Sequence, residues 1–163
     1  MNDGFFFLNS QHNIEFMTQN SLVLLVDDVP QNIQLLGNIL KKEGYSFALT
    51  SSGIETTELL KNTTPDIILL DIMLPGENGF SICERIKKQP HLADIPIIFL
   101  SARHDIKDKI RAFEQGAVDY ITKPFEEIEV IKRVKNHLQA KLDREKIRKY
   151  NSELEKIVEQ RTK

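Results

Sequence analysis

Five short, nearly continuous apolar segments, separated by stretches with helical spacing, constrain the fold of this chain more than any other feature. The five segments are Leu22–Val26, Tyr45–Thr50, Asp66–Leu70, Ile95–Leu100 and Val118–Ile121. Because most of them are apolar at successive positions, they predict strands covered on both faces, as in a parallel sheet. Strict alternation of strands and helices further predicts right-handed crossovers and helices on both sides of that sheet.

The intervening helices are predicted by apolar residues that recur every three or four positions. The first such stretch opens at Pro30 and stops at Gly44, which are favoured residues at a helix start and a helix end. Its apolar residues are Ile33, Leu36, Ile39 and Leu40. Three later stretches repeat the pattern: Ile54 with Leu59 and Leu60, Phe80 with Cys83 and Ile86, and Ile106 with Ile110 and Phe113.

Composition excludes several classes of protein. The chain has 163 residues, enough for one domain with a modest appendage, and its formal charge of -2 argues against general nucleic-acid binding. No apolar run approaches the roughly 18 residues that a membrane span needs. The single cysteine, Cys83, fits a reducing compartment, so the expected location is the cytoplasm.

Carboxylates stand at the ends of two predicted strands. Asp27 and Asp28 follow the first strand, and Asp71 follows the third. In a sheet of order 2-1-3-4-5, these two strand ends flank the crevice where strand order reverses, which is where such sheets bind ligands. Clustered carboxylates repel one another, so a hard divalent cation is the natural partner, and Mg²⁺ (or Mn²⁺) suits such oxygen ligands.

The remaining strand ends carry groups that a phosphoryl group would need. The fourth strand ends in the hydroxyl of Ser101, followed by the small Ala102, and the fifth runs into the ammonium of Lys123. Carboxylates, metal, hydroxyl and lysine together predict a phosphoryl-transfer site. Taken singly, Asp71 would more typically be a turn or cap residue, and Asp28 could be the N-cap of the helix that opens at Pro30.

The same residues closely resemble a known family, the receiver domain of two-component response regulators. The matching elements are Val26-Asp27-Asp28, Leu70-Asp71-Ile72-Met73-Leu74-Pro75-Gly76 with Gly79, Leu100-Ser101-Ala102, Ala117-Val118-Asp119-Tyr120 and Thr122-Lys123-Pro124. The resemblance covers roughly residues 20–140 and implies a flavodoxin-like, doubly wound, five-stranded parallel sheet of order 2-1-3-4-5.

The resemblance also implies a role for each acidic residue. Asp71 would be the phosphoacceptor. Asp28 would bind Mg²⁺ directly, together with Asp71 and the backbone carbonyl of Met73, and Asp27 would act partly through water.

Four further positions receive roles from the resemblance. Ser101, with Ala102 leaving space beside it, and Lys123 would hold the phosphoryl oxygens. Tyr120 would change rotamer as Ser101 moves, although half-buried packing is its ordinary role. The peptide bond between Lys123 and Pro124 would be cis, an isomer open mainly to bonds that precede proline.

The C-terminal part predicts one long helix, because no Gly or Pro interrupts residues 125–163. Ile131, Val134 and Leu138 form a stripe that can pack on the sheet. Further on, the spacing of Ile147, Tyr150, Leu154 and Ile157 predicts a short coiled-coil seam, with a solvated single helix as the alternative.

The predicted organisation of the chain has three parts. They are an N-terminal lead (1–20), which is flexible or a short helix, a receiver domain (21–140) and a helical linker (141–163).

The predicted function is therefore that of a regulatory phosphoacceptor rather than an enzyme. A sensor histidine kinase or phosphotransfer protein would supply the phosphoryl group, and the chain would form a homodimer through its C-terminal helix. Two alternatives stay open: a metal-dependent phosphatase with an aspartyl nucleophile, and an interaction module of the same fold without phosphorylation. The phosphatase would ordinarily have a second acid where Met73 stands.

Overall fold

The computed structural model describes residues 20–102 and 106–162, so nearly all of the predicted N-terminal lead lies outside the described residues. The strands are β1 (Leu22–Val26), β2 (Ser46–Thr50), β3 (Ile67–Asp71), β4 (Ile97–Ser101) and β5 (Asp119–Thr122). They form one parallel sheet of order β2-β1-β3-β4-β5, which confirms the predicted order.

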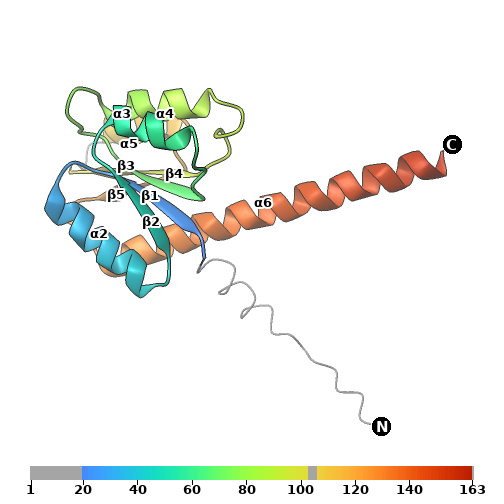
Figure 1. Cartoon of the computed structure of the whole chain (residues 1–163), viewed down its shortest axis with the longest axis horizontal. Coiled ribbons are helices and arrows are strands. Elements are labelled where there is room, and N and C mark those ends of the chain that lie inside the picture. The colour runs from blue at the N-terminus through green and yellow to red at the C-terminus, as the bar shows by residue number, and fades with distance from the viewer. Residues whose placement is uncertain (1–19, 103–105, 163) are drawn as a thin grey trace, which may run out of the picture.

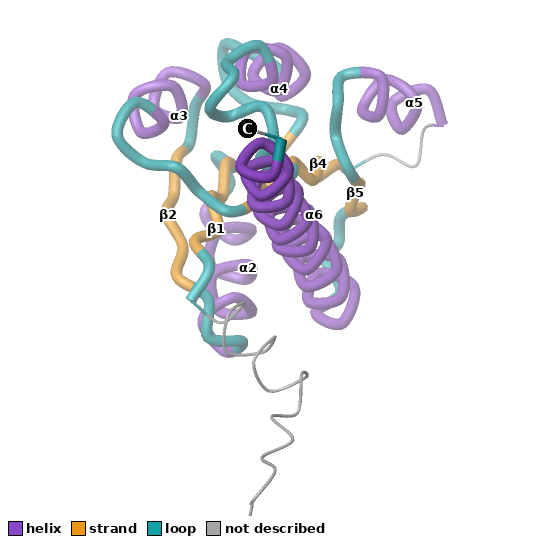
Figure 2. The backbone as a smooth tube through the Cα atoms, turned by 90° about the vertical axis from the view of Figure 1, so that its right-hand side faces the viewer, coloured by secondary structure: helices purple, strands orange, loops and turns teal. Residues whose placement is uncertain are grey.

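Five described helices cover the two faces of this sheet. They are α2 (Pro30–Lys42), α3 (Gly53–Leu60), α4 (Gly79–Lys87), α5 (Ile106–Glu114) and α6 (Glu127–Arg161). Helices α3, α4 and α5 lie on one side of the sheet, and α2 and α6 on the other (Figures 1 and 2). Two apolar clusters match these layers: the first contains Phe80 and Ile86 of α4, and the second contains Leu36 of α2 and Val134 of α6.

The central strands β3 and β4 are as buried as the sequence predicts, whereas in the edge strand β2 only Thr50 is buried. Every residue of β3 and β4 is buried, because helices cover both faces of these central strands. Their burial includes the terminal Asp71 and Ser101, so polar side chains are held inside the edge of the core.

In helix α5, the apolar residues at helical spacing are not the ones that pack on the sheet. It forms where the spacing of Ile106, Ile110 and Phe113 predicts a helix, yet these side chains are 71%, 53% and 52% exposed. The one buried residue of this helix is Ala112. The spacing therefore predicts the helix correctly without identifying the face that packs on the sheet.

Helix α6 is one continuous element of 35 residues. Its first part packs on the sheet through the buried Val134 and Leu138, which confirms that part of the predicted stripe. Lys141 then forms an ion pair with Asp66 (3.0 Å) and Arg148 one with Asp94 (2.7 Å), and both acids precede strands. The helix thus runs from the carboxyl edge of the sheet to its amino edge, and its end projects beyond the domain (Figure 1).

Among the described residues, no helix is both long enough and apolar enough to cross a bilayer.

Candidate functional site

The pairing of β1 with β3 brings three carboxylates together at the carboxyl edge of the sheet. Val26 is paired with Leu70, so the residues that follow them lie side by side. Carboxylate oxygens of Asp27, Asp28 and Asp71 all lie within 4.8 Å of one another. The predicted acidic crevice is therefore present.

Asp27 is fully buried and held by several hydrogen bonds. Its Oδ1 accepts from the backbone N–H of Val29 (2.8 Å), and the amide of Asn32 donates to both carboxylate oxygens (3.3 and 3.1 Å). Its own N–H donates to the carbonyl of Thr50 in β2 (3.2 Å). The orientation of this carboxylate is thus set by β2 and by the start of α2.

Asp28 is exposed, unlike its neighbour. Helix α2 begins at Pro30, its N-cap residue is Val29, and no side chain caps it. The alternative role of Asp28 as an N-cap is therefore wrong, and its carboxylate is left to face the crevice from the solvent side.

Asp71, the last residue of β3, is 3% exposed. Its Oδ1 accepts from the backbone N–H of Met73 (3.1 Å), and its Oδ2 accepts from Nζ of Lys123 (2.8 Å). Burial raises the pKa of Asp71, and the hydrogen bonds from Lys123 and Met73 only partly offset that rise. A cation beside this carboxylate would thus be favourable.

Lys123 supplies a positive charge shared by two carboxylates. Its Nζ lies 2.8 Å from Asp71 and 3.3 Å from Asp27. Although burial opposes it, the hydrogen bond and charge of Asp71 raise the pKa of the Lys123 ammonium. The peptide bond to Pro124 is cis, the isomer that the family resemblance implies.

Ser101 and Tyr120 come from adjacent strands. Ser101 of β4 is paired with Thr122 of β5, and the N–H of Lys123 donates to its carbonyl (2.7 Å). Ser101 and Tyr120 are both 5% exposed, and the Lys109 ammonium lies 5.2 Å from the centre of the Tyr120 ring. Ser101 therefore lies at the edge that carries the carboxylates, and Tyr120, which is paired with Phe99, lies two residues before that edge in β5.

The loop between β3 and α4 folds tightly against the backbone of Asp71. The N–H of Gly79 donates to the carbonyl of Ile72 (2.7 Å), and Met73 and Asn78 form an isolated antiparallel bridge. A Cβ atom on Gly79 would lie 2.3 Å from the carbonyl oxygen of Asp71, so only glycine allows this approach. The loop keeps the backbone of Met73 next to the acidic cluster.

Two residues that support the site were not predicted from the sequence. Asn32 supports Asp27 from the first turn of α2, and Thr50 accepts its N–H. The position of Asn32 five residues after an aspartate is a weak local signal, because asparagine at a helix start has many ordinary uses.

The fold and this edge define a class of protein: an α/β domain with an acidic crevice and a lysine suited to a phosphoryl group. Residues 23–135 match the family described as response regulator receiver domain. This chain belongs to that family, and it is a regulatory phosphoacceptor domain rather than an enzyme.

One curated relative is the DNA-binding dual master transcriptional regulator RpaA of Synechocystis sp., with 40% identity over 113 residues. The match covers 69% of this chain and 47% of the relative, so the chain aligns with about half of that longer protein.

Solved structures agree with this assignment. The receiver domain of a signal transduction histidine kinase from Syntrophus aciditrophicus has a TM-score of 0.69 and 35% identity, covering 74% of this chain and 91% of that one. The receiver domain of the sensor histidine kinase PA1611 from Pseudomonas aeruginosa has a TM-score of 0.68 and 29% identity, covering 73% and 98%. That second structure has a magnesium ion coordinated in its active-site cleft.

Proposed function

We propose that Asp71 accepts a phosphoryl group from the phosphohistidine of a sensor histidine kinase or a phosphotransfer protein. The observation that carries the proposal is the position of Asp71, buried beside two further carboxylates and 2.8 Å from Lys123. In the transfer, the P–N bond to the imidazole breaks and a P–O bond to a carboxylate oxygen of Asp71 forms. The imidazole nitrogen keeps the electron pair of the broken bond.

The residues of the crevice fit a hard divalent cation, because three carboxylates converge there and burial raises the pKa of Asp71. Asp28, Asp71 and the backbone carbonyl of Met73 would hold Mg²⁺ (or Mn²⁺), with Asp27 acting partly through water. When bound, the ion neutralises charge on the carboxylates and on the phosphoryl oxygens. The magnesium in the cleft of the PA1611 receiver supports this assignment.

The remaining residues of the edge would bind and sense the phosphoryl group. The Lys123 ammonium would move from the free carboxylates to a phosphoryl oxygen, and the Ser101 hydroxyl would donate to another, with Ala102 leaving space beside it. Tyr120 lies one strand away from Ser101 and is the residue that would repack when Ser101 moves.

Incubation with Mg²⁺ and a small acyl phosphate, followed by mass spectrometry, tests this proposal. We expect one phosphoryl group on Asp71 and none in Asp71→Asn, whereas Asp143→Asn on the exposed part of α6 serves as the matched control. Modification of Asp71→Asn at the wild-type level would contradict the assignment. An unmodified wild-type protein would favour an interaction module that has the fold without the chemistry.

We further propose that α6 transmits the phosphorylation state. Asp119, next to Tyr120, forms an ion pair with Arg133 (2.5 Å) and a hydrogen bond with Nε2 of His137 (2.8 Å), both in α6. A change at Tyr120 therefore acts on a residue that holds the helix. Because α6 is continuous, a shift at this end extends to the residues after Arg148.

The projecting end of α6 is the proposed contact with a second copy of the chain. Ile147, Tyr150, Leu154 and Ile157 are 59%, 64%, 59% and 46% exposed, and they repeat at three-four-three spacing. Such a seam on an otherwise polar helix is typical of two-stranded coiled coils. On this proposal the receiver is residues 21–140 and the helical linker is 141–163, and the location is the cytoplasm, where the kinase presents its phosphohistidine.

Sedimentation of the wild-type chain and Leu154→Glu, with and without a phosphoryl mimic such as beryllofluoride, tests the contact. We expect self-association that depends on the mimic and is lost in the variant. The control is Ile54→Glu, which changes an equally apolar, 83% exposed residue of α3. The same association state in all samples would remove α6 as the dimer contact while leaving the chemistry of Asp71 untouched.

A further inference from the structure

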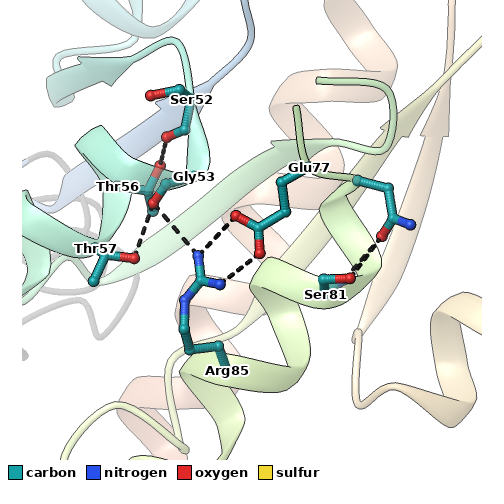
Figure 3. A network of polar contacts seen from close by, with 8 residues as sticks. Ser52, Gly53, Thr56, Thr57, Glu77, Ser81 and Arg85 are labelled. Atoms are coloured by element: carbon teal, nitrogen blue, oxygen red, sulfur yellow. Dashed lines mark hydrogen bonds and ion pairs between the residues drawn. The ribbon is translucent and has the colours of Figure 1, made fainter. Parts of the chain in front are cut away.

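An ion pair outside the carboxylate cluster joins three segments around the loop that follows Asp71. The guanidinium of Arg85 in α4 donates to both carboxylate oxygens of Glu77 (2.5 and 3.1 Å). It also reaches the carbonyl of Gly53, the first residue of α3, at 3.4 Å. Figure 3 shows Arg85 lying between the start of α3 and the Glu77 carboxylate.

The surroundings of Glu77 are shaped for this contact. A Cβ atom on Gly53 would lie 2.0 Å from Oε2 of Glu77, so the carboxylate occupies space that only glycine leaves. The side chains of Glu77 and Arg85 are 27% and 39% exposed, and the hydrogen bond to Glu77 raises the pKa of Arg85. A bidentate, half-buried pair fixes geometry better than an exposed one.

Glu77 precedes Asn78, and Asn78 contacts both the start of the loop and the first turn of α4. Asn78 is bridged to Met73 and caps α4 by accepting the N–H of Ser81 (3.0 Å). Met73 in turn donates its N–H to Asp71 (3.1 Å). A short chain of contacts therefore leads from the Arg85–Glu77 pair to the backbone of Met73.

We propose that Glu77 and Arg85 are positioning residues that hold the β3–α4 loop so that the Met73 carbonyl faces the metal site. This inference rests on the proposed function, because it assigns these two side chains to the Mg²⁺ site of Asp71. Neither side chain would touch the ion or the phosphoryl group. They act by restricting the movement of the loop that carries one of the ligands.

Two variants disrupt the ion pair between Glu77 and Arg85 in different ways. Glu77→Gln keeps the shape but removes the charge that attracts Arg85. Gly53→Ala leaves both partners intact and pushes the Glu77 carboxylate aside, while alanine suits a helix better than glycine. The matched control is Glu84→Gln, which breaks the exposed pair between Glu84 and Lys88 (3.0 Å) in the same helix.

Isothermal titration calorimetry with MgCl₂ on the full chain measures the effect directly. We expect the Kd for Mg²⁺ to rise about tenfold in Glu77→Gln and in Gly53→Ala, and to stay at the wild-type value in Glu84→Gln. Urea unfolding without Mg²⁺ separates positioning from stability, because Gly53→Ala should weaken Mg²⁺ binding without lowering the free energy of unfolding.

An unchanged Kd in Glu77→Gln overturns the inference, whatever Gly53→Ala does, because a clash alone could act in the second variant. A Kd that rises equally in Glu84→Gln overturns it too, since any charge change on α4 would then suffice. If the wild-type protein binds no Mg²⁺ and is not modified on Asp71, the proposed function fails instead.

Discussion

Nζ of Lys123 lies 2.8 Å from Oδ2 of Asp71, a residue 52 positions earlier in the chain. The same ammonium is 3.3 Å from Asp27, so it bridges two buried carboxylates that would otherwise repel. In the metal-free protein Lys123 therefore stands in for part of the charge that a divalent cation would supply. Lysine and metal are expected to compete for these oxygens.

This competition predicts the behaviour of Lys123→Met. Without Mg²⁺, the variant should lose about 3 kcal/mol in the free energy of unfolding at pH 7, because two buried carboxylates lose their shared cation. Saturating MgCl₂ should then stabilise the variant more than the wild type, since no ammonium opposes the ion. Urea unfolding followed by circular dichroism measures both quantities, with the exposed Lys132→Met as control. Equal gains from Mg²⁺ in variant and wild type would contradict the competition.

The raised pKa of Asp71 predicts a dependence of stability on pH. Burial raises the pKa of Asp71 in the folded protein. Its contribution to the free energy of unfolding is therefore fully present below its unfolded pKa of about 3.9, and this contribution is lost as the pH rises through the folded pKa. Asp71→Asn has no such loss. In the absence of metal, the variant should therefore gain stability relative to the wild type as the pH rises from about 3.5 to 7.

Unfolding curves of both proteins across this range test the sign. A stability difference that stays constant would show that Lys123 fully offsets the burial of Asp71, and one that shrinks with rising pH would show that Lys123 outweighs it. Addition of Mg²⁺ should reduce the difference at pH 7, because the ion stabilises the ionised wild-type carboxylate.

Gly79→Ala should damage the site through the backbone. The new Cβ would lie 2.3 Å from the carbonyl oxygen of Asp71, so β3 or the loop must move, and we expect a loss of about 3 kcal/mol in the free energy of unfolding. Gly76→Ala in the same loop is the control: no atom lies within 4 Å of its Cβ, and its φ of +77° should cost only about 1 kcal/mol. Similar losses in both variants would show that loop strain, rather than contact with Asp71, governs this region.

Met73→Asn should shorten the lifetime of phosphorylated Asp71. The Met73 side chain is 71% exposed at the mouth of the crevice and offers no group that orients an attacking water, so slow loss of the phosphoryl group is expected. An amide at this position could hold that water, and we expect decay about threefold faster or more. Decay of the purified phosphorylated protein measures this, with Met73→Leu as the apolar control. Unchanged or slower decay in Met73→Asn would contradict it.

The order of the sheet and the meeting of the acidic strand ends follow from local features. Runs such as Ile67–Leu70 are apolar at every position, and parallel strands bring their carboxyl ends to one edge. The position of Asp27, Asp28 and Asp71 at these strand ends is therefore enough to predict that they meet. The packing stripe of α6 could also be predicted, because Val134 and Leu138 repeat at helical spacing.

Contacts between distant segments could not be predicted in the same way. Nothing near Glu77 in the chain indicates that its carboxylate meets Arg85 over a glycine at the start of α3, and nothing near Lys123 indicates that it bridges Asp27 as well as Asp71. Each of these contacts depends on the placement of at least two other elements.

The sequence by itself determined the alternation of strands and helices, because that pattern comes from the periodicity of apolar residues along one segment. Only the tertiary structure decided which side of α5 packs: it buries Ala112 and leaves Ile106 and Ile110 exposed. A helix buries the face that its neighbours can cover, and the small Ala112 allows close approach to the sheet. Periodicity is a property of one segment, whereas burial is a property of the segments packed around it.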